Sequence, residues 1–333
     1  MKAIVIDGYG SSDDVLHLRD VDKPAIAPDE VLVRVHAASL NPYDWHLMTG
    51  KPYIQRLQFG RKSPVTGLGA DLAGQVEAIG EAVTRFQPGD DVFGEVNGES
   101  PGHPLLDLGS LAEYVAVSQD WVALKPDNLT YEQAAAVPLA AITALQGLRD
   151  YGRVQPGHKV LVNGASGGVG TYAVQIAQAL GADVTGVCST RNVDMVRSIG
   201  ADHIIDYTRE DVTQAEPSYD LVLDNVGNRP LTDWRRILAP KGIYLASFGQ
   251  SDHTWLGPMA KLFRMMILSR FVSQEMVLLS QHRKKEDIDE VRDFLVEGKL
   301  TPVIDRTYPL ADTADALRYL EAGHARGKVV ITI

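Results

Sequence analysis

The residues with the clearest chemical potential form a glycine-rich stretch, Gly164-Ala165-Ser166-Gly167-Gly168-Val169-Gly170. Glycine has no Cβ, so backbone N–H groups in such a stretch can come within hydrogen-bonding distance of a phosphate. A helix that begins behind the stretch adds free N–H groups and the positive end of its dipole. The spacing Ala165-x-Gly167-x-x-Gly170 follows the pyrophosphate-binding pattern, with alanine in the first position and an additional Gly168. An ordinary tight turn can also contain such glycines, so the flanking segments decide between the two interpretations.

The segments on either side have the order of a dinucleotide-binding unit. Before the glycines, Lys159-Val160-Leu161-Val162 is a short apolar run typical of a buried strand. After them, residues 172–180 place small and apolar side chains at helical spacing, and Gly181 follows as a helix-ending glycine. A second apolar run covers residues 184–188. Strand, turn, helix and strand within about thirty residues predict a nucleotide-binding βαβ unit.

The residues that follow the second strand indicate which cofactor is bound. An NAD site places an acidic residue about twenty positions beyond the glycines, where it binds the ribose 2′-hydroxyl. This chain has Ser189, Thr190 and Arg191 there instead. Two hydroxyls and a guanidinium suit a 2′-phosphate, so the predicted cofactor is NADPH. The alternative is that Arg191 only faces solvent at the end of a helix.

The rest of the chain falls into two contrasting segments. Residues 1–125 contain short strands separated by turns, which favours a small all-β barrel. Lys125-Pro126-Asp127 marks the boundary, and beyond it strands alternate with helices, which predicts a parallel, doubly wound sheet. The expected strands of this sheet are residues 160–163, 184–188, 203–205, 221–225, 243–247 and 276–279. Periodicity does not decide whether residues 302–333 join the sheet or return to the first segment.

Composition excludes several classes of protein. The chain has 333 residues, enough for two domains, and its net charge of −11 gives no basic surface for nucleic acid. Its one cysteine, Cys188, allows neither an internal disulfide nor a multi-cysteine metal site. The first residues lack the pattern of a signal peptide, and no apolar run approaches the about 20 residues of a membrane span. The expected location is therefore the cytoplasm.

Ordered motifs run along nearly the whole chain. They are Asn41-Pro42-Tyr43-Asp44, Gly67-Leu68-Gly69-Ala70-Asp71, Gln87-Pro88-Gly89-Asp90-Asp91-Val92-Phe93-Gly94, Gly109-Ser110-Leu111-Ala112-Glu113-Tyr114, Ala134-Ala135-Ala136-Val137-Pro138, the glycine stretch, Asp224-Asn225-Val226-Gly227 and Gly327-Lys328-Val329-Val330. Together they resemble the medium-chain dehydrogenase/reductase superfamily. The resemblance implies an α/β fold in which a GroES-like β-barrel catalytic domain, residues 1–125 and 299–333, is interrupted by a Rossmann domain with a doubly wound parallel sheet, residues 126–298. It places the nicotinamide between the two domains.

Zinc divides this superfamily, because the alcohol dehydrogenase branch holds a catalytic zinc ion with two cysteines and a histidine. Motif alignment puts Asn41 and Ala70 at two of those positions and the third near Leu139, so the side chains that favour zinc are missing. The chain is therefore similar to the zinc-free quinone oxidoreductase branch, which includes reticulon-interacting mitochondrial reductases and chloroplast envelope oxidoreductases. This implies a reductase, without a metal, that transfers hydride from NADPH to quinones or carbonyl-conjugated alkenes. An NADPH-binding sensor or scaffold with little turnover is the alternative.

The resemblance also implies which side chains line the two sites. The expected cofactor residues are Thr143, Ala165, Ser166, Gly167, Gly168, Val169, Gly170, Ser189, Arg191, Tyr207, Asn225, Phe248 and Lys328. Among them, Thr143 lies on the nicotinamide side, Tyr207 packs beside the adenosine and Lys328 reaches the phosphates. The acceptor candidates are Asn41, Tyr43, His46 and Tyr53, with His46 standing where related reductases often carry a tyrosine. Protonation of the product by solvent is the alternative to a donor among these side chains.

The expected partner is a small lipophilic acceptor, and one apolar segment bears on it. Residues 258–279 are rich in Met, Leu and Phe, which predicts a core helix followed by the sixth strand. The alternatives are an apolar lid over the acceptor or peripheral contact with a membrane surface. A homodimer formed by edge-strand pairing, as is common in the superfamily, stays open. A short-chain dehydrogenase would need a Tyr-x-x-x-Lys pair, which this sequence does not contain.

Overall fold

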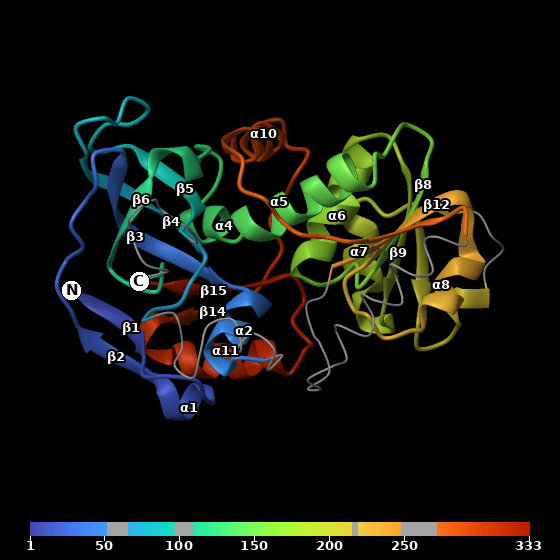
Figure 1. The fold of residues 1–333 in the computed structure, drawn as a ribbon, viewed down its shortest axis with the longest axis horizontal. Coiled ribbons are helices and arrows are strands. Elements are labelled where there is room, and N and C mark those ends of the chain that lie inside the picture. Colours follow the sequence, from blue (N-terminus) through green and yellow to red (C-terminus); the bar gives the residue numbers. More distant parts are fainter. Residues whose placement is uncertain (52–65, 97–108, 215–218, 248–271) are drawn as a thin grey trace. The chain divides into compact units, whose positions relative to one another are not determined.

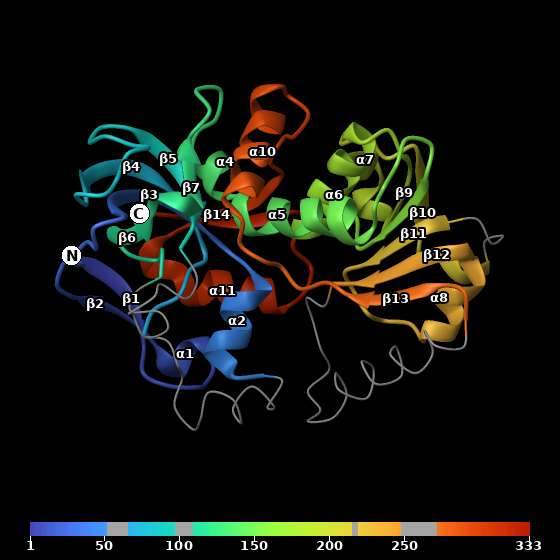
Figure 2. The same cartoon turned by 45° about the horizontal axis from the view of Figure 1, so that its top comes forward.

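The computed structural model describes residues 1–51, 66–96, 109–214, 219–247 and 272–333 (Figures 1 and 2). These residues divide into two compact units. Unit 1 comprises Met1–Ala140, Arg283–Glu297 and Pro302–Ile333, and unit 2 comprises Ala141–His282 and Gly298–Thr301. Unit 1 is thus assembled from three separate stretches of chain, and one of them is the tail that periodicity left open.

Unit 1 is built on a mostly antiparallel sheet with the strand order β14-β15-β3-β4-β5-β7, in which β6 also pairs with β3. Its strands are β3 (Glu30–Leu40), β4 (Asp71–Ile79), β5 (Asp91–Glu95), β6 (Tyr114–Ser118), β7 (Val122–Leu124), β14 (Ile304–Pro309) and β15 (Lys328–Thr332), beside a separate pair, β1 (Lys2–Ile6) and β2 (Leu16–Asp20). Side chains of β3, β4 and β6 form a valine-rich core on one face. The all-β organisation expected for the first segment is confirmed.

The pairing of β15 brings distant parts of the chain together. This strand lies antiparallel to β3, with Val329 opposite Leu40, and parallel to β14. Lys328 therefore comes level with the end of β3, where Asn41 caps helix α2 (Pro42–Thr49). The side of unit 1 that carries β1, α2 and α11 (Thr313–Glu321) has its own buried apolar cluster, which fixes these elements against β15.

Two helices lie in unit 1 although the sequence places them in the cofactor domain, residues 126–298. Helix α4 (Tyr131–Ala135) begins at the Thr130 capping box, and its Tyr131 hydroxyl donates to Asp91 of β5 at 2.6 Å. In α10 (Lys285–Val296), Asp289 accepts from the Arg85 guanidinium at 2.8 and 3.0 Å. These contacts with the barrel explain why the division differs from the expected boundaries at 125 and 299. The other short helices of this unit are α1 (Ser12–Val15), η1 (Gln119–Trp121) and η5 (Leu310–Asp312).

Unit 2 is built on a sheet with the order β10-β9-β8-β11-β12-β13, and every neighbouring pair in it is parallel. Its strands are β8 (Lys159–Asn163), β9 (Asp183–Cys188), β10 (His203–Asp206), β11 (Tyr219–Asp224), β12 (Leu238–Ala246) and β13 (Glu275–Leu278). Its helical segments are α5 (Pro138–Gln146), η2 (Gly147–Tyr151), α6 (Gly168–Ala179), η3 (Thr190–Asn192), α7 (Val193–Ser198), η4 (Val212–Gln214) and α8 (Leu231–Ile237). Helix α5 begins in unit 1. The predicted doubly wound parallel sheet is confirmed.

Helices cover both faces of this sheet. Figure 2 shows α6 and α7 on one face and α8 on the other. On the α8 face, Trp234 packs with Tyr244 and with apolar side chains of the central strands. The strand order reverses between β8 and β11, and ligands of such sheets bind where the carboxyl ends of the strands meet at this point. The fold therefore predicts a ligand site at the carboxyl ends of β8, β9 and β11.

The Met-rich segment is only partly described. Residues 258–271 lie outside the described residues, and with them the predicted core helix or lid. The end of the segment forms β13, the expected sixth strand. No helix in the described ranges is long and apolar enough to cross a membrane.

Candidate functional site

Two glycines of the loop after β8 are required by the fold. Gly164 has φ of +79°, and a Cβ there would lie 2.8 Å from the Val226 side chain. A Cβ on Gly170 would lie 2.1 Å from the Gly164 carbonyl oxygen, which leaves no room for any side chain. Ala165 is fully buried at the start of the loop, and its Cβ packs against Gly186 of β9. These residues shape the turn rather than line an open surface.

Gly167 is a different case, because the protein leaves space around it. A Cβ there would meet only the Gly164 carbonyl oxygen, at 3.4 Å, an ordinary contact. The residue precedes α6, which has no side-chain capping hydrogen bond, and residues 166–169 are partly exposed. The first N–H groups of a helix have no partner within it. The turn thus leaves a cradle at the helix start that suits a pyrophosphate.

A buried asparagine joins this loop to the end of β9. Asn192 Nδ2 donates to Ser166 Oγ at 2.9 Å and lies 3.3 Å from Ser189 Oγ. The side chain is only 4 % exposed, and its Oδ1 has no hydrogen-bond partner within the described parts of the chain. An acceptor of this kind, between two predicted cofactor residues, suits a hydroxyl donor such as a ribose. Sequence reasoning missed Asn192 because asparagine in a short helix carries no motif.

The predicted 2′-phosphate residues do not all face the same way. Thr190 Oγ1 donates to Asp206 Oδ2 at 2.5 Å and lies 2.9 Å from Thr208 Oγ1, so its hydroxyl belongs to the end of β10. The Thr190 hydrogen bond in turn lowers the pKa of Asp206. The expected hydroxyl pair of Ser189 and Thr190 is therefore split. Arg191 is exposed, and Tyr207 is 57 % exposed, so both are accessible to a ligand.

The end of β11 is held by a buried carboxylate. Asp224 accepts from the Tyr244 hydroxyl at 2.7 Å and from Asn163 Nδ2 at 2.8 Å, and burial with this charge raises the pKa of Tyr244. The next residue, Asn225, donates from Nδ2 to the Asn163 carbonyl oxygen at 3.3 Å. Its buried Oδ1 has no partner among the described residues. The structure thus brings Asn225 to the glycine loop, as Gly164 packs against Val226.

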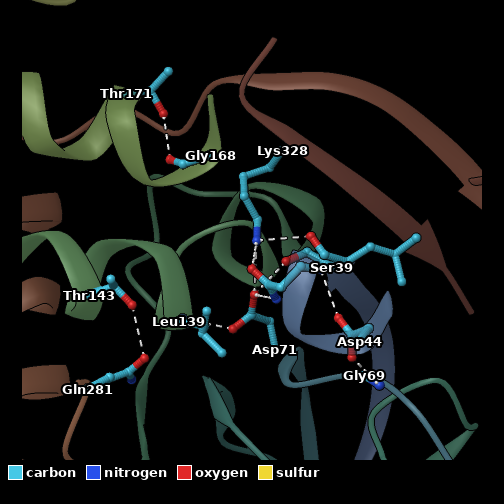
Figure 3. A network of polar contacts seen from close by, with 12 residues as sticks. Ser39, Asp44, Gly69, Asp71, Leu139, Thr143, Gly168, Thr171, Gln281 and Lys328 are labelled. Carbon is cyan, nitrogen blue, oxygen red and sulfur yellow. Dashed lines mark hydrogen bonds and ion pairs between the residues drawn. The ribbon is translucent and has the colours of Figure 1, made fainter. Parts of the chain in front are cut away.

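Of two further cofactor candidates, Thr143 is described by the structure and Phe248 is not. Thr143 on α5 donates from Oγ1 to Gln281 Oε1 at 3.0 Å, which ties α5 to the segment after β13 (Figure 3). Gln146 reinforces the tie by accepting from the His282 backbone N–H at 2.9 Å. The nicotinamide-side role of Thr143 stays a prediction. Phe248 lies outside the described residues.

Unit 1 contains a buried polar cluster centred on Lys328 and Asp71, shown in Figure 3. Lys328 Nζ lies 2.5 Å from Asn41 Oδ1 and 3.2 Å from Asp71 Oδ2. Asp71 Oδ2 also accepts from Ser39 Oγ at 2.7 Å and from Asn41 Nδ2 at 2.8 Å. Lys328 and Asn41 are each 2 % exposed, and Ser39 and Asp71 are fully buried. A buried ion pair of this kind is tolerated because its members are also hydrogen-bonded.

The cluster gathers the three positions that motif alignment equates with metal ligands. Asp71 directly follows Ala70, holds Asn41 through Oδ2 and accepts from the Leu139 backbone N–H through Oδ1 at 2.8 Å. Asp44 supports it from α2, accepting from the N–H groups of Asn41 and Gly69 at 2.8 and 2.9 Å. Burial raises the pKa of Asp44 to about 7 against the effect of these two donors. Within the described ranges, no group of three or more His, Cys, Asp or Glu side chains could hold a metal ion.

Lys328 is the clearest departure from the predicted site. The expected reach to the cofactor phosphates does not fit this geometry, because Nζ is buried and bonded to Asn41, Asp71 and the Leu40 carbonyl oxygen. The ion pair with Asp71 was missed because the two residues belong to separate motifs, and neither motif indicates that its charged residue has a partner in the other. A lysine at the start of an apolar strand, where a buried position is expected, was the available signal.

Two of the remaining acceptor candidates, Tyr43 and His46, lie on helix α2. Tyr43 is 40 % exposed, and desolvation followed by the nearby Asp44 charge raises the pKa of its hydroxyl. His46 Nδ1 lies 2.7 Å from the Lys51 carbonyl oxygen, an arrangement that holds the ring to its own helix end. Tyr53 lies outside the described residues.

Sequence reasoning did not single out a cation near Tyr43. Arg283, at the start of the α10 segment, lies 3.6 Å from the buried Glu95 carboxylate and over the Trp121 ring at 4.4 Å. Burial lowers the pKa of the guanidinium. The nearby Glu95 charge raises it, but this effect is smaller than that of burial. Arg283 was missed because it lies outside every quoted motif.

Comparison with known proteins finds two family matches along the chain. Residues 27–127 match the family described as alcohol dehydrogenase GroES-like domain, and residues 199–331 match the family described as zinc-binding dehydrogenase. The mitochondrial NAD(P)H oxidoreductase RTN4IP1 of Mus musculus is 33% identical over 100% of this chain and 89% of its own. The chloroplastic NADPH-dependent alkenal/one oxidoreductase of Arabidopsis thaliana is 33% identical over 99% of this chain and 79% of its own. The structure of the quinone oxidoreductase from Coxiella burnetii has a TM-score of 0.82 at 31% identity and covers 100% of this chain and 99% of that one.

These names correct one expectation. The cytoplasmic location expected from the sequence is contradicted, since the mouse relative is named mitochondrial and the Arabidopsis relative chloroplastic. The absence of a signal-peptide pattern was the basis for that expectation, and it does not exclude an organelle.

The nicotinamide cofactor and the redox activity follow from the family rather than from any single side chain. Both domain families match, the relatives span the whole chain, and the parallel sheet carries the nucleotide loop at its switch point. The chain belongs to the medium-chain dehydrogenase/reductase superfamily and is an oxidoreductase with quinone oxidoreductase-like homologues.

Proposed function

We propose that this chain is a zinc-independent reductase that transfers hydride from NADPH to quinones or carbonyl-conjugated alkenes. The observation that carries the proposal is the buried Lys328–Asp71 pair, which binds the Asn41 side chain and the Leu139 backbone N–H at positions that motif alignment equates with metal ligands. Those positions offer an amide, a methyl group and a backbone N–H, none of which favours zinc. The printed names of the relatives from Arabidopsis and Coxiella burnetii support the acceptor class.

The residues of unit 2 fit a dinucleotide. A Cβ at Gly167 would meet no atom closer than 3.4 Å, so a phosphate can approach the backbone there, and the buried Oδ1 atoms of Asn192 and Asn225 lack partners within the described chain. When bound, the cofactor supplies a hydride from its nicotinamide. Quinones and conjugated enones are already electrophilic, so the protein needs only to hold and orient them and exclude water. This is why no Lewis acid is required for the proposed chemistry.

The test is NADPH consumption with a panel of quinones and conjugated enones. We expect acceptor-dependent loss of NADPH absorbance, and with NADPH deuterated at C4 the label should appear on a carbon of the reduced enone. Unchanged absorbance across the panel would overturn the proposal and favour an NADPH-binding sensor. Label lost to solvent instead of product would exclude direct hydride transfer.

Removal of divalent metal is expected to leave activity unchanged. Dialysis against a chelator should alter kcat by less than the scatter of replicate assays, because the positions expected for zinc ligands hold no cysteine or histidine. Metal content by mass spectrometry checks that the dialysed enzyme is depleted. Loss of activity that returns with zinc would contradict the proposal.

Replacing Arg191 with alanine is expected to weaken NADPH binding about tenfold or more and to leave NADH binding nearly unchanged. A charge-assisted hydrogen bond to phosphate contributes about 1.5–3 kcal/mol, and only NADPH carries the 2′-phosphate. Fluorescence titration of each dinucleotide measures the ratio. Arg197→Ala, on the exposed part of α7 beside Asp194, is the matched control. Equal losses for both dinucleotides would refute the assignment of Arg191.

A further inference from the structure

The ammonium of Lys328 has its hydrogen bonds accounted for inside unit 1. Nζ lies 3.2 Å from the Leu40 carbonyl oxygen, 2.5 Å from Asn41 Oδ1 and 3.2 Å from Asp71 Oδ2. An ammonium has three N–H donors, and these three acceptors match them in number. Lys328 is also only 2 % exposed. Any effect of this cation on a ligand must therefore act through the groups that it holds.

Lys328 and Asp71 together fix the orientation of the Asn41 amide. An ammonium only donates hydrogen bonds and a carboxylate only accepts them. Oδ1 of Asn41 must therefore face Lys328, and Nδ2 must face Asp71, to which it donates at 2.8 Å. The flipped amide would set its NH2 group against the ammonium and its oxygen against the carboxylate. Asparagine flips are otherwise hard to assign, but here the chemistry allows one orientation.

In this orientation one of the two N–H groups of the Asn41 amide has no acceptor among the described residues. Nδ2 has two hydrogens, and in the described chain only Asp71 accepts from it. The backbone is equally fixed, since the Asn41 N–H donates to Asp44 Oδ2 at 2.8 Å. A buried donor that lacks a partner favours a ligand oxygen that can accept from it. With Oδ1 committed to Lys328, the amide offers a ligand only a donor.

We propose that Lys328 is a positioning residue that holds the Asn41 amide so that its second N–H donates to the carbonyl oxygen of the acceptor. This proposal rests on the reductase function proposed above. As hydride adds to the β-carbon of an enone, the electron pair of the C=C bond moves toward the carbonyl and negative charge builds on its oxygen. A fixed donor at that oxygen stabilises the charge, and a proton from solvent then completes the reduced product. The cofactor is oxidised by two electrons as the enone is reduced by two.

Two substitutions separate positioning from support of the fold. Asn41→Asp is isosteric and keeps an oxygen for Lys328, but it removes the N–H donors and sets a second carboxylate oxygen against Asp71. Lys328→Met removes the cation and keeps much of the volume. Each variant and the double variant are assayed well below their own melting temperatures. Lys125→Met is the matched control, because that lysine also binds backbone carbonyl oxygens of unit 1, at 3.2 and 2.9 Å, away from the cluster.

We expect Asn41→Asp to lower kcat by about 100-fold, the usual effect of removing one oxyanion donor. Lys328→Met should lower kcat about 10- to 100-fold through the same donor, with the KM for NADPH nearly unchanged. The double variant should be no slower than Asn41→Asp alone, because the two residues act as one unit. A Lys328→Met enzyme with normal kcat, or losses that multiply in the double variant, would overturn the proposal.

A second measurement keeps this inference separate from the reductase function. The side-chain NH2 of Asn41 gives a pair of ¹H–¹⁵N signals, identified by their disappearance in Asn41→Asp. In the wild-type protein we expect two well-separated signals, because one hydrogen is bound to Asp71 and the amide cannot flip. In Lys328→Met the pair should broaden or shift together. If no acceptor is reduced, the proposed function fails while these spectra still decide whether Lys328 orients Asn41.

Discussion

Replacing Lys328 with methionine is expected to lower the free energy of unfolding by about 3–5 kcal/mol, because removal of one partner leaves a buried charge uncompensated. Asp71 is fully buried and would lose its only ion-pair partner among the described residues. It would keep the hydrogen bonds from Ser39, Asn41 and the Leu139 backbone, which limit the loss. Urea unfolding monitored by tryptophan fluorescence measures the change in the free energy of unfolding.

The compensating variant sharpens this result. Asp71→Asn removes the negative charge and keeps an oxygen for the Leu139 N–H, so Lys328→Met with Asp71→Asn should recover much of the lost stability. Lys23→Met, which breaks an exposed pair with Glu77, should change the stability far less than Lys328→Met. A small loss for Lys328→Met, comparable to that of Lys23→Met, would show that Asp71 does not depend on the cation.

Alanine at Gly167 is expected to weaken NADPH binding about 10- to 100-fold without unfolding the protein. Its φ of −86° and ψ of 179° are open to any residue, and the added Cβ meets no atom closer than 3.4 Å. The methyl group instead occupies the cradle at the start of α6, where it displaces a phosphate from N–H donors worth about 1.5–3 kcal/mol each. Fluorescence titration with NADPH measures binding, and calorimetry measures the melting temperature.

Alanine at Gly170 is the matched comparison, three residues along the same loop. Its Cβ would lie 2.1 Å from the Gly164 carbonyl oxygen, so the turn itself must move. We expect Gly170→Ala to lose about 3 kcal/mol or more of stability together with cofactor binding. If Gly167→Ala bound NADPH as tightly as the wild type, the loop would not be a phosphate cradle.

The sequence was sufficient where local pattern and global fold agree. The βαβ unit was predictable because β8, the glycines and α6 are contiguous, and each obeys a local rule of spacing. The alternation of strands and helices likewise predicted the parallel sheet of unit 2. Within the loop, the pattern did not separate Gly170, which the fold requires, from Gly167, which leaves space for a ligand.

The candidate site was harder where contacts join distant positions. Lys328 pairs with Asp71 across 257 residues, and no periodicity links the two. Thr190 was expected to face a phosphate, but a contact with Asp206, 16 residues away, directs its hydroxyl elsewhere. Helix α10 follows the strands of unit 2 along the chain yet joins unit 1, because Arg85 binds Asp289 there. These pairings are properties of the folded sheet order and register, which a local pattern does not contain.

The place of β15 between β14 and β3 has a consequence for how the chain folds during synthesis. Lys328 and its partner carbonyl at Leu40 are 288 residues apart, and the whole of unit 2 is made between them. Until β15 emerges, the edge of β3 that it will cover has unpaired backbone groups and Asp71 has no counterion. Unit 2 can form its sheet earlier, from strands that follow one another closely. We therefore expect unit 1 to complete its fold after unit 2, and its unpaired β3 edge to be open to aggregation while the ribosome completes the chain.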